Sequence, residues 1–241
     1  MAAGQRFEFF PAVSAGWVAS SEKFWEPISK YINHFKIRGS YGLVGSDAFA
    51  SGAPHFLYQN NIGIGSAHKF WTGLPTSEIS KQGPGFYVLA VQDAGWEHVK
   101  KFDIGFDMML FDQLNITFDY FHDKRERILM SRASWPSMLG YWGSKPWSNI
   151  GEVENQGFEL SLNWTKQFGK DLTLDLRGNF TYNQNEYKYV DEPNYPYVWQ
   201  TNTGKPLNTV KGYIAEGLFT SEEEIANSPD QSQLGANIMP G

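Results

Sequence analysis

The chain has 241 residues, and its 24 glycines, 12 prolines and 16% aromatic content favour β-structure over a helical protein. The formal net charge is -6, with acidic and basic residues mixed along the chain, which excludes the basic patch of a nucleic-acid-binding protein. The absence of cysteine excludes a disulfide framework and thiolate metal sites.

The first two predicted strands are separated by a connection of medium length. Residues 7–19 place their large apolar side chains on one parity, with an irregularity at Pro11, and predict a first strand. Residues 20–33 lose the alternation and begin with a short helical turn. The alternation returns over residues 35–43 and predicts a second strand.

Residues 45–95 form a long segment without a sustained period. A compact soluble domain seldom contains a connection of this length. We therefore expect either a functional loop or short strands inside it, and the apolar run at residues 86–91 is the best candidate for such a strand.

A first predicted hairpin follows this segment. Large apolar residues alternate with small or acidic ones over residues 102–110, and the pattern continues over residues 114–120 after a turn at residues 111–113. A charged stretch at residues 123–132 and a long aromatic loop at residues 133–148 come next.

The most regular pattern predicts a second, longer hairpin. Large apolar residues occupy nearly every second position of residues 158–164 and 172–182, on either side of a short turn. The opposite face carries Glu159 and Arg177 among amides and hydroxyls. Strands of about ten residues with one apolar and one polar face are what a membrane-spanning barrel requires, with lipid on one side and water on the other.

The ends of the chain and the lengths of its connections complete this picture. Residues 221–225 predict a short capped helix with a solvated acidic start. No apolar run is long enough for a membrane helix, and the first residues lack the apolar core of a signal peptide. Short turns alternate with long loops along the six strands, which is typical of an outer-membrane barrel.

Six segments, in this order, resemble the SusC/RagA-type TonB-linked outer-membrane transporters of Bacteroidetes-like bacteria. They are FPAVSAGW at residues 10–17, KIRGSYG at 36–42, WE at 96–97 with KFDIGF at 101–106, DYF at 119–121, NIGEVENQGFEL at 149–160 and GYIAEGLF at 212–219. The resemblance implies a barrel of about 22 strands that is plugged by an N-terminal domain. It also implies TonB-driven uptake of oligosaccharides or peptides with a SusD-like surface lipoprotein over the extracellular loops.

We therefore expect residues 1–241 to be a partial all-β barrel domain of the bacterial outer membrane, in contact with its lipid. About six to eight antiparallel transmembrane strands with long extracellular loops fit this length, too few to close the barrel. We expect the signal peptide, the TonB box and the plug domain to be absent from this segment, so contact with the TonB complex would be made by the missing N-terminal part.

The strand carboxylates permit two interpretations. Asp103, Asp107, Asp119, Glu159 and Asp175 could provide the paired carboxylates of glycoside hydrolysis. Their alternation with apolar neighbours instead favours a wet lumen face, and we expect no enzymatic activity.

The strongest candidates for ligand or partner contact are aromatic residues. Trp135, Tyr141, Trp142 and Trp147 lie close together in the sequence, and aromatic faces stack on sugar rings and anchor protein interfaces. The alternative is that they pack the loops together or form the interfacial aromatic girdle. The five histidines lack metal-site spacing and are expected in loops or on the lumen face, and nothing indicates a cofactor.

Three hypotheses follow from the residues. The leading one is part of a plugged nutrient transporter, the second is a soluble carbohydrate-binding β-sandwich that uses the loop aromatics, and the third is a glycan-active enzyme that uses the strand carboxylates. A sandwich buries its apolar face inside the protein, whereas a barrel presents that face to lipid. The sequence does not distinguish a glycan substrate from a peptide.

Overall fold

The structure is a computed structural model that describes residues 4–47, 53, 55–72, 79–91, 94–136, 138, 145–215, 217–230 and 239–240, with residues 64–72, 79–82, 84 and 86 described by their backbone alone. The chain divides into two compact units, Met1–Leu207 and Asn208–Gly241. The described part of the second unit contains one helix, α1 (Glu222–Asn227). Its N-cap is Ser221, whose side chain accepts a hydrogen bond from the Glu224 backbone N–H, as the sequence predicts.

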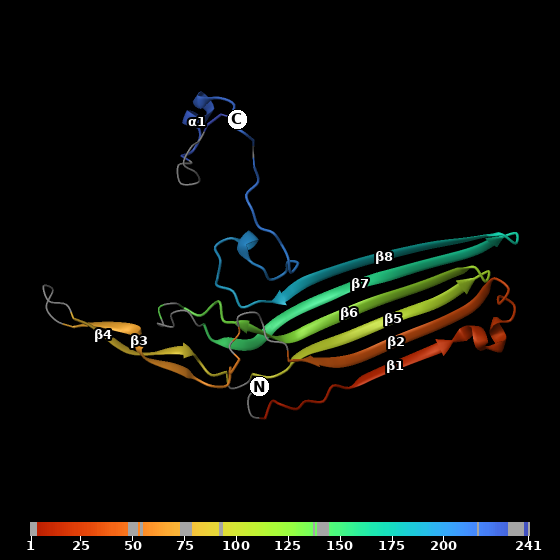
Figure 1. Ribbon diagram of the computed structural model, residues 1–241, viewed down its shortest axis with the longest axis horizontal. Helices are drawn as coiled ribbons and strands as arrows, with labels where there is room; N and C mark the ends of the chain where they lie inside the picture. The colour runs from red at the N-terminus through yellow and green to blue at the C-terminus, as the bar shows by residue number, and fades with distance from the viewer. Residues whose placement is uncertain are drawn as a thin grey trace. The chain divides into compact units, whose positions relative to one another are not determined.

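The described residues of the first unit form eight strands. These are β1 (Ala12–Val18), β2 (Ile32–Ser46), β3 (Asn61–Thr72), β4 (Ile79–Val88), β5 (Glu97–Leu110), β6 (Leu114–Ser131), β7 (Trp147–Phe168) and β8 (Leu172–Tyr189). An antiparallel sheet has the order β1-β2-β5-β6-β7-β8, and β3 pairs with β4 inside the connection between β2 and β5 (Figure 1). The all-β class and the six predicted sheet strands are confirmed.

The strands differ from the prediction mainly in length. β7 has 22 residues and begins at Trp147, inside the predicted aromatic loop, and β6 continues through the charged stretch to Ser131. β1 begins only at Ala12, directly after Pro11, which has no N–H to donate to the ladder. The run at residues 86–91 contributes the last residues of β4, which ends at Val88.

The short turns lie at one end of the sheet, and the long connections leave from the other end (Figure 1). In the turn between β5 and β6, Phe111 and Asp112 have φ of 54° and 55°, as a type I′ hairpin turn requires. Neighbouring connections support this turn, because Phe111 N–H donates to Tyr31 O and Asn33 Oδ1 accepts from Asp112 N–H. The predicted segregation of short turns and long loops is confirmed.

One face of the sheet, here called the apolar face, carries large apolar side chains near the turn end. Rings from neighbouring strands form a ladder on this face: the register partners Phe106 and Phe118 stack at a centroid distance of 5.5 Å, and Phe118 stacks on its diagonal neighbour Phe158 at 6.1 Å. Many of its side chains are open to the surroundings, and Leu176 and Phe180 on β8 are 54% and 55% exposed. Between the described elements, strands pack closely only against their hydrogen-bonded neighbours. The sheet is therefore a single layer and lacks the second sheet of a sandwich.

The apolar face ends at a row of aromatic side chains, here called the aromatic row. The row consists of Tyr41, Phe102, Tyr120, Phe158 and Tyr182, one from each of β2, β5, β6, β7 and β8. From the start of β8 to this row the strand rises about 33 Å at ~3.3 Å per residue. At the usual barrel tilt of ~40°, this corresponds to an apolar band about 25 Å tall, which matches that of outer-membrane barrels.

Beyond the aromatic row the apolar face becomes charged, whereas the opposite face is mixed and still carries Lys101, Asp123 and Arg125. The positions that continue the apolar face now carry charged or amide side chains, listed here as the charged band: His98, Lys100, His122, Lys124, Glu126, Glu152, Glu154, Gln156, Gln184, Glu186 and Lys188. The opposite face, here called the polar face, gains apolar residues at Val99 and Val153. No helix among the described residues is long and apolar enough to cross a membrane.

Candidate functional site

A row of register partners crosses the polar face. It contains Gly16, Arg38, Gly105, Asp119 and Glu159, one from each of β1, β2, β5, β6 and β7. Arg38 and Asp119 are separated by β5, yet Arg38 Nη2 lies 2.6 Å from Asp119 Oδ2. A Cβ atom at Gly105 would lie 2.1 Å from Asp119 Oδ1. Glycine at position 105 therefore provides the space in which the two charged side chains meet.

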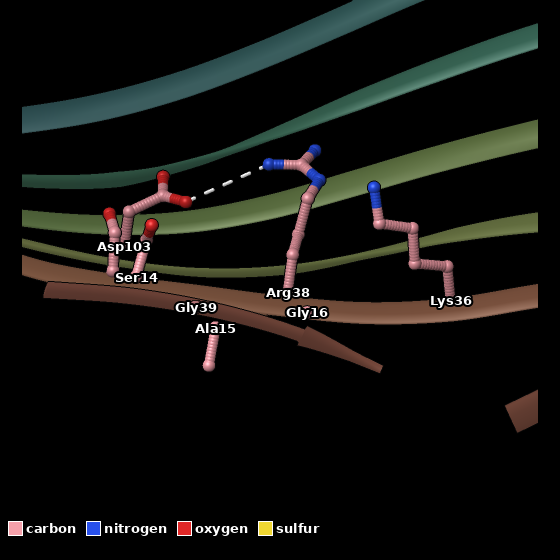
Figure 2. A pocket seen from close by; sticks show the side chains of 8 residues that line it. Ser14, Ala15, Gly16, Lys36, Arg38, Gly39 and Asp103 are labelled. Carbon is pink, nitrogen blue, oxygen red and sulfur yellow. Dashed lines mark ion pairs between the residues drawn. The ribbon is translucent and has the colours of Figure 1, made fainter. Parts of the chain in front are cut away.

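Arg38 also binds two carboxylates of β5. Its Nε lies 3.3 Å from Asp107 Oδ2, and its Nη1 lies 3.7 Å from Asp103 Oδ1. Figure 2 shows Arg38 and Asp103 on the same side of the sheet as Lys36, whereas Ala15 points to the opposite side. One guanidinium thus connects three strands through charge-assisted contacts. We call these four residues, Arg38 with its three aspartates, the Arg38 brace.

The Arg38 brace accounts for most of the carboxylates that the sequence singled out. Three of the five, Asp103, Asp107 and Asp119, share Arg38, and Asp175 accepts a hydrogen bond of 2.5 Å from Thr165 Oγ1. A glycosidase needs one carboxyl kept protonated and one ionised by different surroundings. Here a single guanidinium joins three carboxylates on one face of the sheet, which suits a structural brace.

A hollow of about 510 Å³ lies on the polar face beyond the brace, toward the loop end. Its lining comes from β5, β6, β7 and β8 and from Leu207 after β8, and it includes aliphatic and amide side chains together with the charged Lys101, Asp123 and Arg125. Val99, Ile128, Met130 and Val153 form the aliphatic part. The volume is within the range of about 300–1,000 Å³ that is usual for ligand sites in proteins.

The charged band on the other face is internally paired. Lys100 and Lys124 are register partners with like charges, and Glu126 contacts both at 2.7 Å. Glu154 and Glu186 are likewise partners, and Lys188 contacts them at 2.9 and 3.3 Å. The shared counter-charge offsets the repulsion between like charges that face each other across strands.

Asp191 fastens the segment after β8 to the turn after β6. The Ser134 backbone N–H and hydroxyl donate to its carboxylate at 2.8 to 3.0 Å, and Arg132 Nε lies 3.3 Å from Asp191 Oδ2. Burial raises the pKa of Asp191, but the bonds from Ser134 and the charge of Arg132 outweigh it, so the pKa lies below the usual 3.8.

The predicted aromatic contacts are only partly described. Trp135 lies half-buried in the turn after β6, and its backbone N–H donates to Arg132 O. Trp147 is the first residue of β7 and packs against the buried cluster of Leu57, Val91, Ala94 and Leu129. Tyr141 and Trp142 lie outside the described residues. Contact of these four residues with a ligand or partner stays a prediction.

An exposed aromatic pair was missed by the sequence reasoning. Tyr197 is the N-cap of the 3-10 helix η4 (Val198–Gln200) and Trp199 is its middle residue; their rings stack at 5.8 Å, and the two residues are 59% and 62% exposed. Lys205 Nζ donates to Trp199 O at 2.6 Å and holds this turn. The only sequence signal is a Tyr and a Trp two residues apart in a Pro- and Asn-rich stretch.

The histidines do not form a metal site in the described part of the chain, where no group of three or more His, Asp or Glu side chains could hold an ion. His98 Nε2 lies 2.9 Å from Glu8 Oε1, and His122 contacts Glu154. The expectation of loop or lumen positions is wrong for these two, because both lie in the charged band.

Comparison with known proteins identifies the family of this sheet. The TonB dependent receptor-like β-barrel model matches residues 3–224. TonB-dependent receptor P39 of Formosa agariphila is 29% identical over 232 residues, which are 95% of this chain and 21% of that protein. TonB-dependent receptor SusC of Bacteroides thetaiotaomicron is 26% identical over 193 residues, 75% of this chain and 17% of SusC.

A solved structure shows the same fold. The RagAB peptide transporter superposes with a TM-score of 0.56 at 21% identity, covering 74% of this chain and 18% of that chain. The chain thus spans about a fifth of the length of the curated relatives and of this structure. It belongs, as a member of SusC/RagA type, to the TonB-dependent receptor-like β-barrel family of the bacterial outer membrane.

Proposed function

We propose that residues 1–241 form part of the wall of a TonB-dependent importer of oligosaccharides or peptides. The observation that carries the proposal is the apolar band of about 25 Å below the aromatic row, uncovered by any described element and opposed by a wet, charged face. A soluble carbohydrate-binding sandwich would require a second layer on that band.

The names of the relatives support a proposal for the partners. One relative is named SusC, and a structure of the same fold is a RagAB peptide transporter. We propose that a SusD-like surface lipoprotein covers the loop end of the sheet, and that a TonB complex supplies energy through parts of the protein outside residues 1–241. Residues 1–241 would then be a partial barrel domain that binds outer-membrane lipid.

The function proposed for the wall is selective passage without covalent chemistry. The Arg38 brace joins three strands, and its carboxylates share one cation. The relatives are TonB-dependent receptors, which are transporters and not enzymes. We further propose that Trp135, Tyr141, Trp142 and Trp147 contact the substrate or the lipoprotein lid.

Growth of the native bacterium tests this function. Deletion of the gene should abolish growth on one class of polymer, either glycan or protein, while growth on simple sugars and amino acids is unchanged. A protonophore should stop uptake by the wild type, because TonB-driven transport depends on the proton gradient. Uptake that survives the protonophore, or an unchanged deletion strain on every polymer, would contradict the proposal.

A further inference from the structure

The hollow on the polar face lies beyond the aromatic row, where aliphatic residues join the charged and amide residues of this face. Below the aromatic row this face carries the Arg38 brace, whereas the hollow has an aliphatic floor of Val99, Ile128, Met130 and Val153. The outward positions at the same level belong to the charged band. Aliphatic side chains therefore point away from the lipid side, into the space that water and substrate would occupy.

The rim of the hollow carries amides with free hydrogen-bonding capacity. Asn155 and Asn183 line it, and Asn185 beside them already accepts a bond from Leu207 N–H at 2.9 Å. Asn155 Oδ1 is buried and accepts no hydrogen bond from any residue that the structure describes. A buried acceptor without a partner is costly, so a ligand N–H or O–H at this position would be stabilised.

The chemistry of the lining distinguishes two classes of ligand. Sugar rings are bound by aromatic planes, and among the described residues the lining contains a single aromatic one, Tyr187. The aliphatic floor offers no hydrogen bonds to sugar hydroxyls, and the charged Lys101, Asp123 and Arg125 can pair with charged groups that peptides carry and neutral oligosaccharides lack. The same floor accepts an aliphatic side chain, and rim amides pair with peptide N–H and C=O groups.

We propose that this hollow is a substrate subsite for peptides, in which Val99, Ile128, Met130 and Val153 receive an aliphatic side chain and Asn155 accepts a main-chain N–H. The volume of about 510 Å³ suits a stretch of a few residues. The inference rests on the proposed function, since it names the substrate class of the importer.

Binding to the complete purified protein tests the subsite. The probes are a mixture of short oligopeptides and, separately, a mixture of short neutral oligosaccharides, with the retained molecules identified by mass spectrometry. The wild type should retain peptides enriched in Leu, Ile and Val. Asn155→Ala should weaken retention about tenfold, the equivalent of one hydrogen bond. Retention of oligosaccharides alone would overturn the proposal.

Two floor variants and a control complete the design. Val153→Asp should abolish the aliphatic preference, and Val153→Thr, which keeps the shape, should weaken retention if the aspartate variant does not fold. Gln156→Ala on the same strand but the other face should leave retention unchanged. Peptide retention that no floor or rim variant alters would place the subsite elsewhere. Protonophore-sensitive uptake of glycans but not of peptides would refute the subsite and keep the importer. Absence of protonophore-sensitive uptake of both glycans and peptides would refute the importer.

Discussion

The two halves of the long strand β7 differ in the side chains that they place on the face of the aromatic ladder. From Phe158 to Phe168 its apolar side chains share the face of the aromatic ladder, and Glu159 lies on the other face. From Trp147 to Gly157 the face of the ladder carries Glu152 and Glu154, and Val153 lies opposite. The backbone register continues across the aromatic row, so the side chains alone mark the change.

This difference locates the membrane boundary. A strand needs about 9–11 residues to cross a bilayer, and β7 has 22. Strand length alone therefore does not show which half is in lipid. The change from apolar to charged side chains on the face of the aromatic ladder does, because outward charges are tolerated only where they meet water or headgroups.

The largest expected effect separates the two halves on one face of β7. Leu162→Arg places a charge in the apolar band and should lower the free energy of unfolding by about 2–4 kcal/mol. Gln156→Arg, on the same face beyond the aromatic row, should change it by about 0–1 kcal/mol. Urea unfolding of the complete protein in lipid vesicles, followed by tryptophan fluorescence, measures both. Equal losses of unfolding free energy in the two variants would contradict a difference in environment between the two halves of β7.

The next effect concerns the lower half of the polar face. Gly105→Ala puts a Cβ atom 2.1 Å from Asp119 Oδ1 and 2.5 Å from Phe118 O, and should lower the free energy of unfolding by about 1–3 kcal/mol. The matched control is Gly178→Ala on β8, where a Cβ atom meets nothing within 4 Å. The same urea titration measures both variants. Equal free energies of unfolding would argue against close packing around Gly105.

A smaller effect tests the Arg38 brace itself. Arg38 and Asp119 side chains are 31% and 17% exposed, so water screens their interaction in part. A double-mutant cycle with Arg38→Met and Asp119→Asn should give a coupling free energy of about 1 kcal/mol. Strictly additive losses would mean that the two side chains do not stabilise each other.

The smallest effect concerns the loop end. Because the pKa of Asp191 is lowered in the folded state, its contact with Ser134 contributes fully above pH 3.8 and is lost as the pH falls through the lowered pKa. Hydrogen exchange of the Ser134 amide should therefore show protection at neutral pH that disappears in acid. Asp191→Asn should remove this pH dependence, and an unchanged profile in the variant would contradict the assignment.

Much of the fold followed from sequence pattern. Alternation in residues 102–120 and 158–182 predicted two hairpins and their turns, because near the turn end one face of the sheet is apolar and the other is polar. The alternation failed to predict the strands beyond the aromatic row. Residues 123–131 continue β6, but charged residues outward and mixed residues inward remove the contrast on which the prediction depends.

The site was less predictable than the fold. Asp103, Asp107 and Asp119 lie on one polar face, as their alternation with apolar residues indicated, but sequence spacing could not show that Arg38, far away in the chain, joins all three. The contact of Arg38 with Asp119 depends on the register of β2 with β5 and on the lack of a Cβ atom at Gly105. The hollow depends on the register of four strands and is equally hidden.

The most direct measurement follows β8 residue by residue from Leu172 to Tyr189. The chain contains no cysteine, so single cysteines can carry spin labels, and relaxation by oxygen and by a water-soluble nickel chelate reports lipid and water separately. We predict oxygen maxima at positions 174, 176, 180 and 182, nickel maxima between them, and nickel access at 184, 186 and 188. Uniform nickel access along the whole strand would contradict a lipid-facing apolar band.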